Sequence, residues 1–399
     1  MVLLGVLSLP KKDWTPKEWI ITIPLYHETN LFAMTILVSA AALRTSGART
    51  IYRQFLEHLK TRVDGNQYYI MVDKDMEMPT IDGVSYIVVD VSNKIKRAVF
   101  ELFGFKRILK QIPATVDLVV SLQNLGIRQL RNLRQIIYYH QPLPFFDYRW
   151  NIFHRDELVM WLYKNLYPLL VKRSIGRNVD MITQLPSIKE GIVKKYGVEK
   201  SHVHVLFPDL EQIDIQNIPF EPTIDSKKLN LIYPATFQPY KGHDFLVRVI
   251  ARLKEQGLAE DIRIHLTLEK DKSDRLVSLM KAMDVEGNFV FHGVVPHDRL
   301  LSMYKSSVGL LFPSVIETLG LPLIESARFG KAIIACDLKY AHEVLGEYSG
   351  ARFVEPRLIK GWADAIINVM DNRKQYCPLE HPERSSWETF FDLIESKSR

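Results

Sequence analysis

Two glutamates on either side of a short turn are the residues of this chain best placed to do chemistry. Glu317 and Glu325 flank a Gly-Leu-Pro turn in the segment FPSVIETLGLPLIESARFGKAIIACD, residues 312–337. The apolar run before this turn predicts a buried strand. The run from Pro322 predicts a helix, because a proline in the first helical turn lacks only an N–H group that would be unpaired there. Glu317 is therefore expected in the loop after the strand, and Glu325 in the first turns of the helix.

The start of such a helix favours an anion, and a carboxylate beside it favours hydroxyl groups. Free N–H groups and the helix dipole bind phosphate, and Gly320 lets the backbone approach such a ligand closely. Ionised Glu317 and Glu325 only accept hydrogen bonds, so they would bind hydroxyl donors. Phosphate flanked by hydroxylated groups describes a nucleotide sugar. The alternative for Glu325 is a structural role in the helix dipole, worth about 0.3–1 kcal/mol.

Three other residues lie where expected strands lead into loops. Lys241, in PYKGH, would face a phosphate or be a solvated surface charge. His140 ends the strand QIIYYH, and it would face a ligand or be a hydrogen-bonded, half-buried histidine. Gly47, in the turn RTSGAR (44–49), suits close approach of backbone to phosphate or acceptor, although simple turn chemistry explains it equally well. Beyond His140, the aromatic segment 145–150 would stack on an acceptor sugar or pack a loop.

Metal chemistry and disulfide chemistry are both disfavoured. The triplet Asp73-Lys-Asp75 spells an Asp-x-Asp metal motif, but such triplets are common by chance, and we expect no essential metal. The two cysteines, Cys336 and Cys377, have no metal-binding spacing and form no disulfide framework, which indicates a reducing, cytosolic setting. No cofactor is expected apart from a nucleotide sugar acting as donor substrate.

Length and charge indicate two domains and an anionic partner. A chain of 399 residues is about twice the size of one domain. Its net charge of +6 suits a phosphorylated substrate or an acidic membrane surface, and no nucleic-acid-binding motif is present. The apolar stretch LFAMTILVSAAAL is too short to span a bilayer, so no transmembrane helix is predicted.

Strands and helices alternate along the chain in two series, which predicts the α/β class with two parallel sheets covered on both faces. We expect a leader at 1–33 added in front of a natural start at Met34, an N-terminal Rossmann-like domain at 34–215 and a linker at 216–228. A C-terminal Rossmann-like domain would follow at 229–380. Ligands of such sheets lie beyond the carboxyl ends of the strands, so a cleft between facing domains is the expected site.

The motif ETLGLPLIE resembles the E-x7-E signature of glycosyltransferase family 4, whose members are retaining enzymes with the GT-B fold. The segments YKGHDFL, FHGVVPHDRLLSMYKSS and HEVLG follow the family's order through the C-terminal half, and RTSGARTIYRQF extends a looser resemblance to the N-terminal half. The resemblance implies that the last helix, within 381–399, crosses back to the N-terminal domain.

The resemblance also implies residue roles. Glu317 would contact the donor hexose and Glu325 the ribose hydroxyls, while Lys241 would contact the diphosphate. His140 would lie near the donor sugar as a third catalytic residue. The backbone beside the sugar and diphosphate, together with two further glycines, completes the implied donor-binding set: Thr318, Leu319, Gly320, Gly293 and Gly47.

The implied function is transfer of a hexose (mannose-, glucose- or rhamnose-like) to a glycan or lipid-linked acceptor, as in surface polysaccharide synthesis. One departure is that Pro234-Ala235 stands where the family carries a Gly-Arg pair, so the diphosphate loses a cationic ligand unless Arg44 or Arg49 replaces it. The alternatives are a phosphorylase or epimerase of the same fold, and a non-catalytic protein that binds nucleotide sugar or scaffolds a partner.

A membrane surface is a further expected partner. The segment 94–112 is basic and amphipathic, which suits an anionic bilayer or an ordinary surface helix, and Gly104 interrupts it. Lipid-linked acceptors in the resembled family favour the bilayer, which would place the protein in the cytoplasm, peripheral on the inner face of the membrane.

Overall fold

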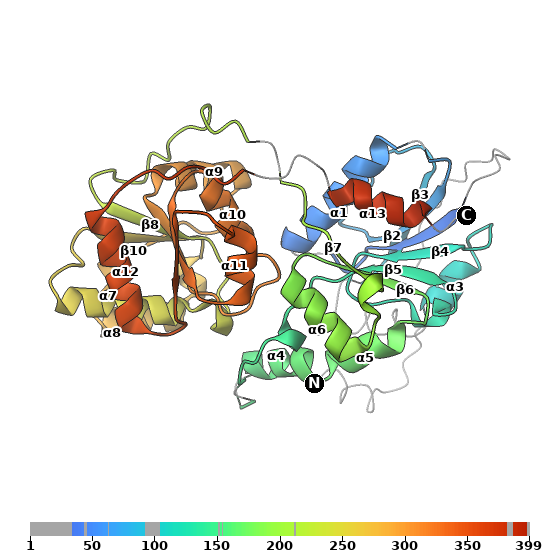
Figure 1. The fold of residues 1–399 in the computed structure, drawn as a ribbon, viewed down its shortest axis with the longest axis horizontal. Coiled ribbons are helices and arrows are strands. Elements are labelled where there is room, and N and C mark those ends of the chain that lie inside the picture. The colour runs from blue at the N-terminus through green and yellow to red at the C-terminus, as the bar shows by residue number, and fades with distance from the viewer. Residues whose placement is uncertain are drawn as a thin grey trace. The chain divides into compact units, whose positions relative to one another are not determined.

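The computed structural model describes residues 34–43, 46–62, 64–91, 104–150, 152–153, 155–210, 213–380 and 386–396. The chain forms two compact units, residues 1–209 with 384–399 and residues 210–383. Each unit holds a parallel sheet with helices packed on it (Figure 1). The predicted α/β class with two Rossmann-like sheets, the GT-B architecture, is confirmed. The expected leader at 1–33 lies outside the described residues.

The first unit is built on a seven-stranded sheet with the order β3-β2-β1-β4-β5-β6-β7, and all its neighbouring strands pair in parallel. Its strands are β1 (Thr35–Ser39), β2 (Gln67–Asp73), β3 (Val84–Val89), β4 (Leu118–Ser121), β5 (Arg134–Tyr138), β6 (Val179–Thr183) and β7 (Val203–Val205). Its described helices are α1 (Ser46–Lys60), α3 (Phe105–Leu109), α4 (Arg155–Asn165), α5 (Tyr167–Ser174), α6 (Pro186–Tyr196) and α13 (Ser386–Glu395).

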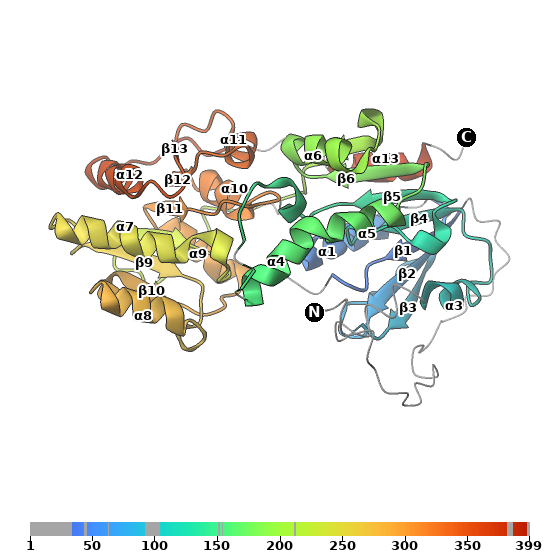
Figure 2. The ribbon, with the colours of Figure 1, turned by 90° about the horizontal axis from the view of Figure 1, so that it is seen from below.

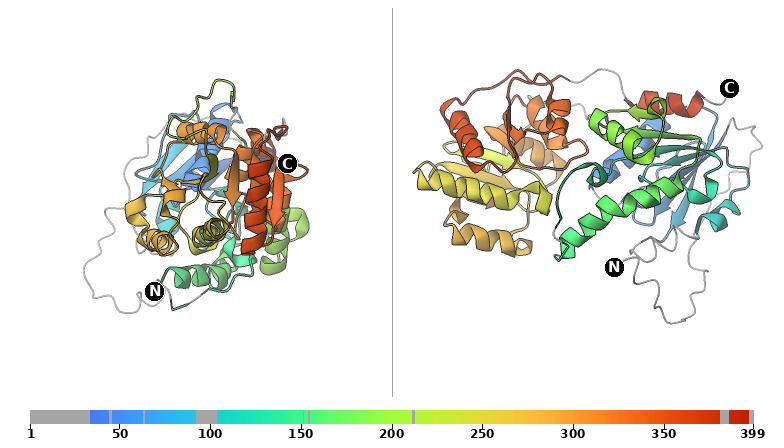
Figure 3. Two further views of the ribbon diagram at one scale, coloured as in Figure 1. Left: turned by 90° about the vertical axis from the view of Figure 1, so that its left-hand side faces the viewer. Right: turned by 60° about the horizontal axis from the view of Figure 1, so that its bottom comes forward.

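Successive side chains of a strand point to opposite faces, and this alternation divides the core of the first unit in two. Ile36 and Val38 of β1 enter a cluster that includes buried residues of α1 and α13, whereas Leu37 enters a second cluster with residues of α3. The buried strands are apolar on both faces because helices cover both. α4 and α5 run nearly end to end along this unit (Figures 2 and 3).

The last helix of the chain, α13, belongs to the first unit. Trp387, Phe390 and Phe391 are each at most 2% exposed and pack with Phe55 of α1, whose ring stacks on that of Phe391 at a centroid distance of 5.6 Å. The indole N–H of Trp387 donates to Gln54 Oε1 at 2.9 Å. The C-terminal helix therefore completes a core that the N-terminal part of the chain begins.

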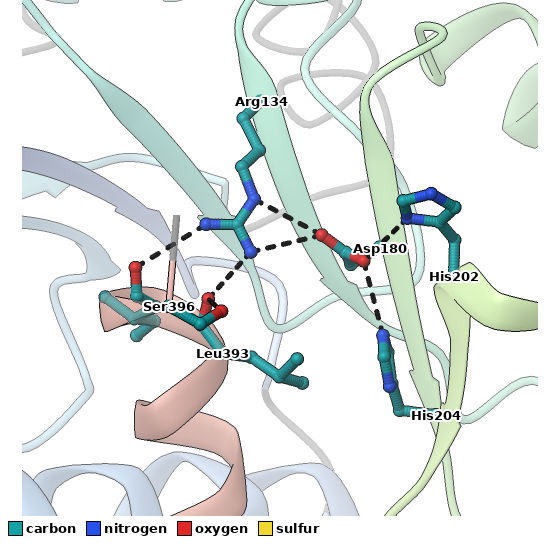
Figure 4. Close-up of polar contacts among 7 residues, drawn as sticks. Arg134, Asp180, His202, His204, Leu393 and Ser396 are labelled. Carbon is teal, nitrogen blue, oxygen red and sulfur yellow. Dashed lines mark hydrogen bonds and ion pairs between the residues drawn. The ribbon is translucent and has the colours of Figure 1, made fainter. Parts of the chain in front are cut away.

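A buried ion pair holds the C-terminal end of α13 (Figure 4). Arg134 at the start of β5 donates through Nη2 to Leu393 O at 2.7 Å and to Asp180 Oδ2 at 3.1 Å. The side chain of Asp180 is 2% exposed, and its Oδ1 also bonds to His202 at 2.9 Å and His204 at 3.2 Å. A cation at the last carbonyls of a helix complements the helix dipole, so this cluster fixes where α13 ends.

The second unit holds a six-stranded parallel sheet with the order β10-β9-β8-β11-β12-β13. Its strands are β8 (Leu229–Tyr233), β9 (Ile262–Leu266), β10 (Phe289–Phe291), β11 (Gly309–Phe312), β12 (Ala332–Cys336) and β13 (Ala351–Val354). Its helices are α7 (His243–Glu255), α8 (Asp274–Ala282), α9 (His297–Ser306), α10 (Leu321–Arg328), α11 (Lys339–Leu345) and α12 (Ile359–Asp371). The chain order reverses between β8 and β11, and parallel α/β sheets bind ligands at such a reversal, beyond the carboxyl ends of the strands.

The structure divides the chain at Asp209, and residues 213–228 precede β8 within the second unit. α1 begins at Ser46, inside the segment 44–49 that was expected to be a turn. Of the basic segment 94–112, only residues 104–112 are described, and they contain the five-residue helix α3. Among the described helices, none has both the length and the apolar character needed to cross a bilayer.

Candidate active site

The second unit brings Lys241 and Glu317 together at the reversal point of its sheet. Lys241 ends the short 3-10 turn Pro239–Lys241 after β8, and Glu317 lies in the loop after β11. Lys241 Nζ donates to Glu317 Oε1 at 2.5 Å, and the two side chains are only 14% and 11% exposed. An ion pair so poorly hydrated interacts far more strongly than one in water. Lys241, the residue predicted to bind the diphosphate, and Glu317, the residue predicted to bind the sugar, thus form one charged pair.

Hydrogen bonds from the core hold the two loops that carry this pair. Tyr233 of β8 donates its hydroxyl to Lys241 O at 2.5 Å, and Tyr340 of α11 donates to Ser314 O at 2.6 Å. Both tyrosines are 1% exposed or less, and Val315 N donates to Tyr240 O at 2.9 Å, which ties one loop to the other. The backbone around Lys241 and Glu317 is therefore part of the fold.

The loops also approach each other closely at Gly242. This glycine has φ 76°, which L residues rarely adopt, and a Cβ added to it would lie 3.0 Å from Pro313 O. A side chain at Gly242 would strain the backbone and push against the loop of Glu317. The glycine thus keeps Lys241 next to the β11 loop.

The predicted turn between the glutamates has the expected form. Gly320 precedes α10 with φ 76° and ψ 56°, and Pro322 lies in the first turn of this helix. Leu319 is buried, at 3% exposure, and Thr318 is half-buried. The chain therefore turns sharply from Glu317 into the helix that carries Glu325, which keeps both carboxylates on one continuous segment.

Both oxygens of Glu325 have partners on the neighbouring helix α9. His297 Nε2 lies 3.0 Å from Oε1, and the hydroxyl of Tyr304 donates to Oε2 at 2.9 Å. Tyr304 is fully buried, whereas the His297 side chain is 42% exposed. Neither residue was among the site residues predicted from the sequence. The available signal was their spacing of seven, which places them on one side of a helix.

The pKa values of two side chains beside the ion pair are shifted so that both side chains remain uncharged. Burial, followed by the nearby Glu317, raises the pKa of Tyr240 to about 12. Burial, followed by the nearby Lys241, lowers the pKa of His243 to about 3. Both groups are neutral at pH 7, so they add no charge beside Lys241 and Glu317. The Tyr240 ring lies 5.5 Å from Lys241 Nζ, in reach of a cation–π contact.

Gly293 lies after β10 at one edge of the same sheet. It has φ 70°, and its N–H donates to Leu268 O at 3.0 Å. The loop from Gly293 leads directly into α9, which begins at His297. Gly293 is therefore connected to Glu325 through the helix that holds this carboxylate, and its role in donor binding remains a prediction.

His140 and Gly47 lie in the first unit. The His140 backbone N–H donates to Asn124 Oδ1 at 2.6 Å, and burial lowers the pKa of the imidazole to about 4. Within the described part of the chain, His140 Nδ1 has no hydrogen-bond partner. Gly47 lies in the first turn of α1. His140 is thus neutral and keeps one nitrogen unused, and the roles of both residues remain predictions.

The segment after His140 packs against its own unit in part. The Phe145 ring lies 5.6 Å from Tyr139 and 5.8 Å from Tyr196, which are core tyrosines. Trp150 is 9% exposed. Loop packing, one of the two roles predicted for these aromatic residues, therefore describes Phe145 and Trp150.

The remaining predicted groups have local partners. Arg49 donates to Asp75 O at 3.1 Å, and Arg44 lies outside the described residues. Asp73 is buried, and its Oδ1 accepts from Lys74 N at 3.0 Å. Among the described residues, no three acidic, histidine or cysteine side chains are grouped as metal ligands.

Residues 214–384 match the family model described as "Glycosyl transferases group 1". The chain is 25% identical over 243 residues to the O-antigen chain mannosyltransferase RfbU of Salmonella typhimurium, an alignment that covers 60% of this chain and 61% of that one. The chain thus spans less than two thirds of the length of this curated relative.

Solved structures of low sequence identity share the fold. A sucrose-phosphate synthase from Thermosynechococcus elongatus has a TM-score of 0.63 at 15% identity, with 85% of this chain and 90% of that chain covered. HepE from Anabaena, crystallised with UDP and glucose, has a TM-score of 0.58 at 12% identity, with coverage of 85% and 90%. At these identities, the likeness to the solved structures shows the fold alone.

Proposed function

We propose that the protein is a retaining glycosyltransferase of family 4 type that moves a hexose from a nucleotide-sugar donor to a glycan or lipid-linked acceptor. Surface polysaccharide synthesis is the proposed setting, in the cytoplasm. The observation that carries the proposal is the Lys241–Glu317 pair at the reversal point of the sheet, beside the helix that presents Glu325. The Lys241 cation suits a diphosphate, and the carboxylates of Glu317 and Glu325 suit sugar hydroxyls. The family match over residues 214–384 and the mannosyltransferase relative support it.

In the proposed reaction, the acceptor hydroxyl attacks the anomeric carbon on the face from which the diphosphate leaves. The bond from the anomeric carbon to the leaving oxygen breaks, and the departing diphosphate takes the acceptor's proton. Lys241 and the N-terminal end of α10 stabilise the negative charge that develops on the diphosphate. Glu317 holds a hexose hydroxyl and Glu325 holds the ribose hydroxyls, and His140, whose imidazole is neutral, is the third proposed catalytic residue.

The first experiment is thermal unfolding of the purified protein with UDP, GDP, dTDP and their sugars, repeated with Glu325→Ala. One nucleotide family should raise the unfolding temperature of the wild-type protein, and Glu325→Ala should lose this effect. The exposed Glu347→Ala, in the same unit, serves as the control and should keep the response. If no nucleotide stabilises the wild-type protein, the donor site proposed here is wrong.

A non-catalytic nucleotide-sugar-binding protein is the second candidate. It is favoured by the Pro234-Ala235 pair, which replaces the Gly-Arg pair that the resembled family carries before the lysine. Release of nucleoside diphosphate from the stabilising sugar nucleotide distinguishes the two. Turnover that Glu317→Ala abolishes supports the transferase, whereas binding without any turnover on glycan and lipid-linked acceptors supports the second candidate.

A further inference from the structure

Exposed apolar side chains of the first unit are concentrated in a short stretch of sequence. Ten large hydrophobic residues are exposed in the described part of the chain, and five of them lie between residues 152 and 170. They are Ile152 (48% exposed), Phe153 (93%), Tyr163 (37%), Leu169 (52%) and Leu170 (46%). We call residues 152–153 and 157–177 the α4–α5 surface. Clusters of this kind mark interaction sites far more often than scattered single residues do.

Within its described side chains, residues 157–165, helix α4 has no buried side on which its apolar residues could pack. Residues 158–163 read LVMWLY, and every described side chain from 157 to 165 is at least partly exposed. A helix that merely covers a sheet buries one apolar stripe, as α1 does with Ile51, Tyr52 and Phe55. α4 therefore presents more apolar surface than its own unit covers.

Helix α5 continues this surface with a clear division of its sides. Its buried residues are Pro168, Val171 and Ser174, which are spaced three apart and face the unit. Leu166 N donates to Leu162 O at 2.8 Å, so α4 continues into α5 with little interruption (Figure 2). Tyr163 and Leu170, seven residues apart, are consequently expected to lie on one side of the combined helix.

The exposed charges in and beside this stretch are mainly basic. Arg149, Lys172, Arg173 and Arg177 are exposed, whereas of the acidic side chains described between 147 and 177, Asp147 is exposed and Glu157 is partly exposed. Lys172 and Arg173 follow the exposed leucines of α5 in the sequence, with the buried Val171 between them. Long cationic side chains next to leucine and tyrosine match an interface whose interior is apolar and whose border carries negative charge.

We propose that the α4–α5 surface docks on an anionic lipid bilayer. Leu169, Leu170 and Tyr163 would enter the boundary between headgroups and acyl chains, while Lys172 and Arg173 would bind lipid phosphates. This site differs from segment 94–112, which was expected to carry the membrane contact. Docking does not depend on the proposed transferase function, because it is measured without a donor. If that function holds, docking would bring a lipid-linked acceptor to the unit that carries His140.

The test is co-sedimentation of the full chain with vesicles of phosphatidylcholine, alone or mixed with phosphatidylglycerol. Wild-type protein should sediment with the anionic vesicles and be released by high salt. Leu169→Ser/Leu170→Ser and Lys172→Glu/Arg173→Glu should each weaken this binding by about tenfold or more. The matched controls lie elsewhere in the first unit, Met78→Ser for an exposed apolar residue and Lys194→Glu for an exposed charge on α6, and both should bind as wild type.

A probe placed on the surface separates docking from a general change in the protein. In a Cys377→Ser background, Leu170→Cys labelled with an environment-sensitive dye should report an apolar environment on anionic vesicles, and Met78→Cys should not. The proposal is overturned if no vesicle binds the wild-type protein, or if the α5 variants bind as well as the controls. It is also overturned if these variants instead abolish self-association of the free protein, because the surface would then contact a second copy.

Discussion

Lys241 and Glu317 neutralise each other, and this pairing has a consequence for ligand binding. A diphosphate that takes Lys241 must replace Glu317 as its partner, which releases the carboxylate to accept a hydroxyl hydrogen bond. The donor would thus exchange one charge pair for another inside a poorly hydrated site, where an unpaired charge is costly. Binding of the diphosphate would therefore coincide with release of the Glu317 carboxylate, which could then accept a hydrogen bond from a hydroxyl group.

Glu317→Gln should therefore separate affinity from turnover. With the carboxylate removed, Lys241 has no competing anion, and nucleoside diphosphate should bind severalfold more tightly than to the wild-type protein. Turnover should fall by about two orders of magnitude, because an amide would bind the hexose hydroxyl less strongly than the carboxylate proposed for this role. Calorimetric titration and a turnover assay measure the two effects, and Glu343→Gln, on α11, is the control. Weaker diphosphate binding in Glu317→Gln would contradict the competition between the two anions.

Tyr304 is predicted to act through Glu325. Removing its hydroxyl with Tyr304→Phe leaves Glu325 Oε2 without its buried donor, so the carboxylate should lose its orientation. A hydrogen bond to a charged group contributes about 1.5–3 kcal/mol, and nucleotide affinity should fall by roughly tenfold or more. Tyr348→Phe removes a comparable hydroxyl, bonded to Lys331 O at 2.7 Å, and should leave affinity unchanged. Equal losses in both variants would indicate a general effect on stability.

At the scale of elements, a chain of hydrogen bonds connects β8, β9, β10 and α9. His265 lies on β9. Its Nε2 is 2.9 Å from Asn230 Oδ1, and its Nδ1 is 2.9 Å from His292 Nε2. Arg299 donates to His292 Nδ1 at 3.3 Å and pairs with Glu221 at 3.2 Å. Because the arginine only donates, the hydrogen bonds are all satisfied when both histidines are neutral. The chain also fixes Glu221, ahead of β8, to α9.

This chain of histidines predicts acid sensitivity. Burial, followed by His292, lowers the pKa of His265 to about 4, whereas a histidine in the unfolded chain titrates near 6.5. Its contribution to stability is present above pH 6.5 and is lost as pH falls from there toward 4, because only the unfolded chain takes the proton. The free energy of unfolding should drop by about 2 kcal/mol per such histidine between pH 7 and pH 5.

Urea unfolding at the two pH values checks this prediction. His265→Gln should be less stable at pH 7 but should lose less stability on acidification than the wild-type protein does. His342→Gln, at a histidine with an exposed side chain, is the control and should keep the wild-type dependence. If His265→Gln and the wild-type protein lose the same stability on acidification, His265 is not the sensitive group.

At the scale of the whole molecule, the chain passes from one unit to the other twice, near 209 and near 384. The second passage returns α13 to the core of the first unit. Asp209 connects the chain at both crossings to the first unit. Its Oδ1 accepts from Ser386 N at 3.1 Å, and its Oδ2 lies 2.8 Å from His58 Nε2 on α1. The first unit is therefore complete only when α13 has been made.

Truncation after residue 383 should unfold the first unit and spare the second. Burying Trp387, Phe390, Phe391 and Ile394 contributes about 1.5–3 kcal/mol each, which together approaches the whole stability of a typical domain. Hydrogen exchange should then be fast in α1 and β2 but remain slow in α7 and β11. Removal of residues 397–399 alone serves as the control and should change neither. Slow exchange in α1 of the truncated chain would show that α13 is dispensable.

Local sequence patterns were enough to predict much of the framework of this protein. Apolar runs and helical periodicity predicted two alternating series of strands and helices, with β11 and α10 on either side of the Gly-Leu-Pro turn, because these signals depend on neighbouring residues. The same local logic placed Glu317 in a loop, Gly320 at a sharp turn and Glu325 on the following helix. It did not predict β3 or β13, and it treated the beginning of α1 as a turn.

Which of these residues meet depends on how the chain folds as a whole. Lys241 and Glu317 are 76 residues apart, and they pair because β8 and β11 are neighbours at the reversal of strand order. The partners of Glu325 come from α9, and Arg134 meets the carbonyl of Leu393 across 259 positions of sequence. Such contacts depend on strand order and helix packing, which are set by burial of the whole core, and no local pattern encodes them.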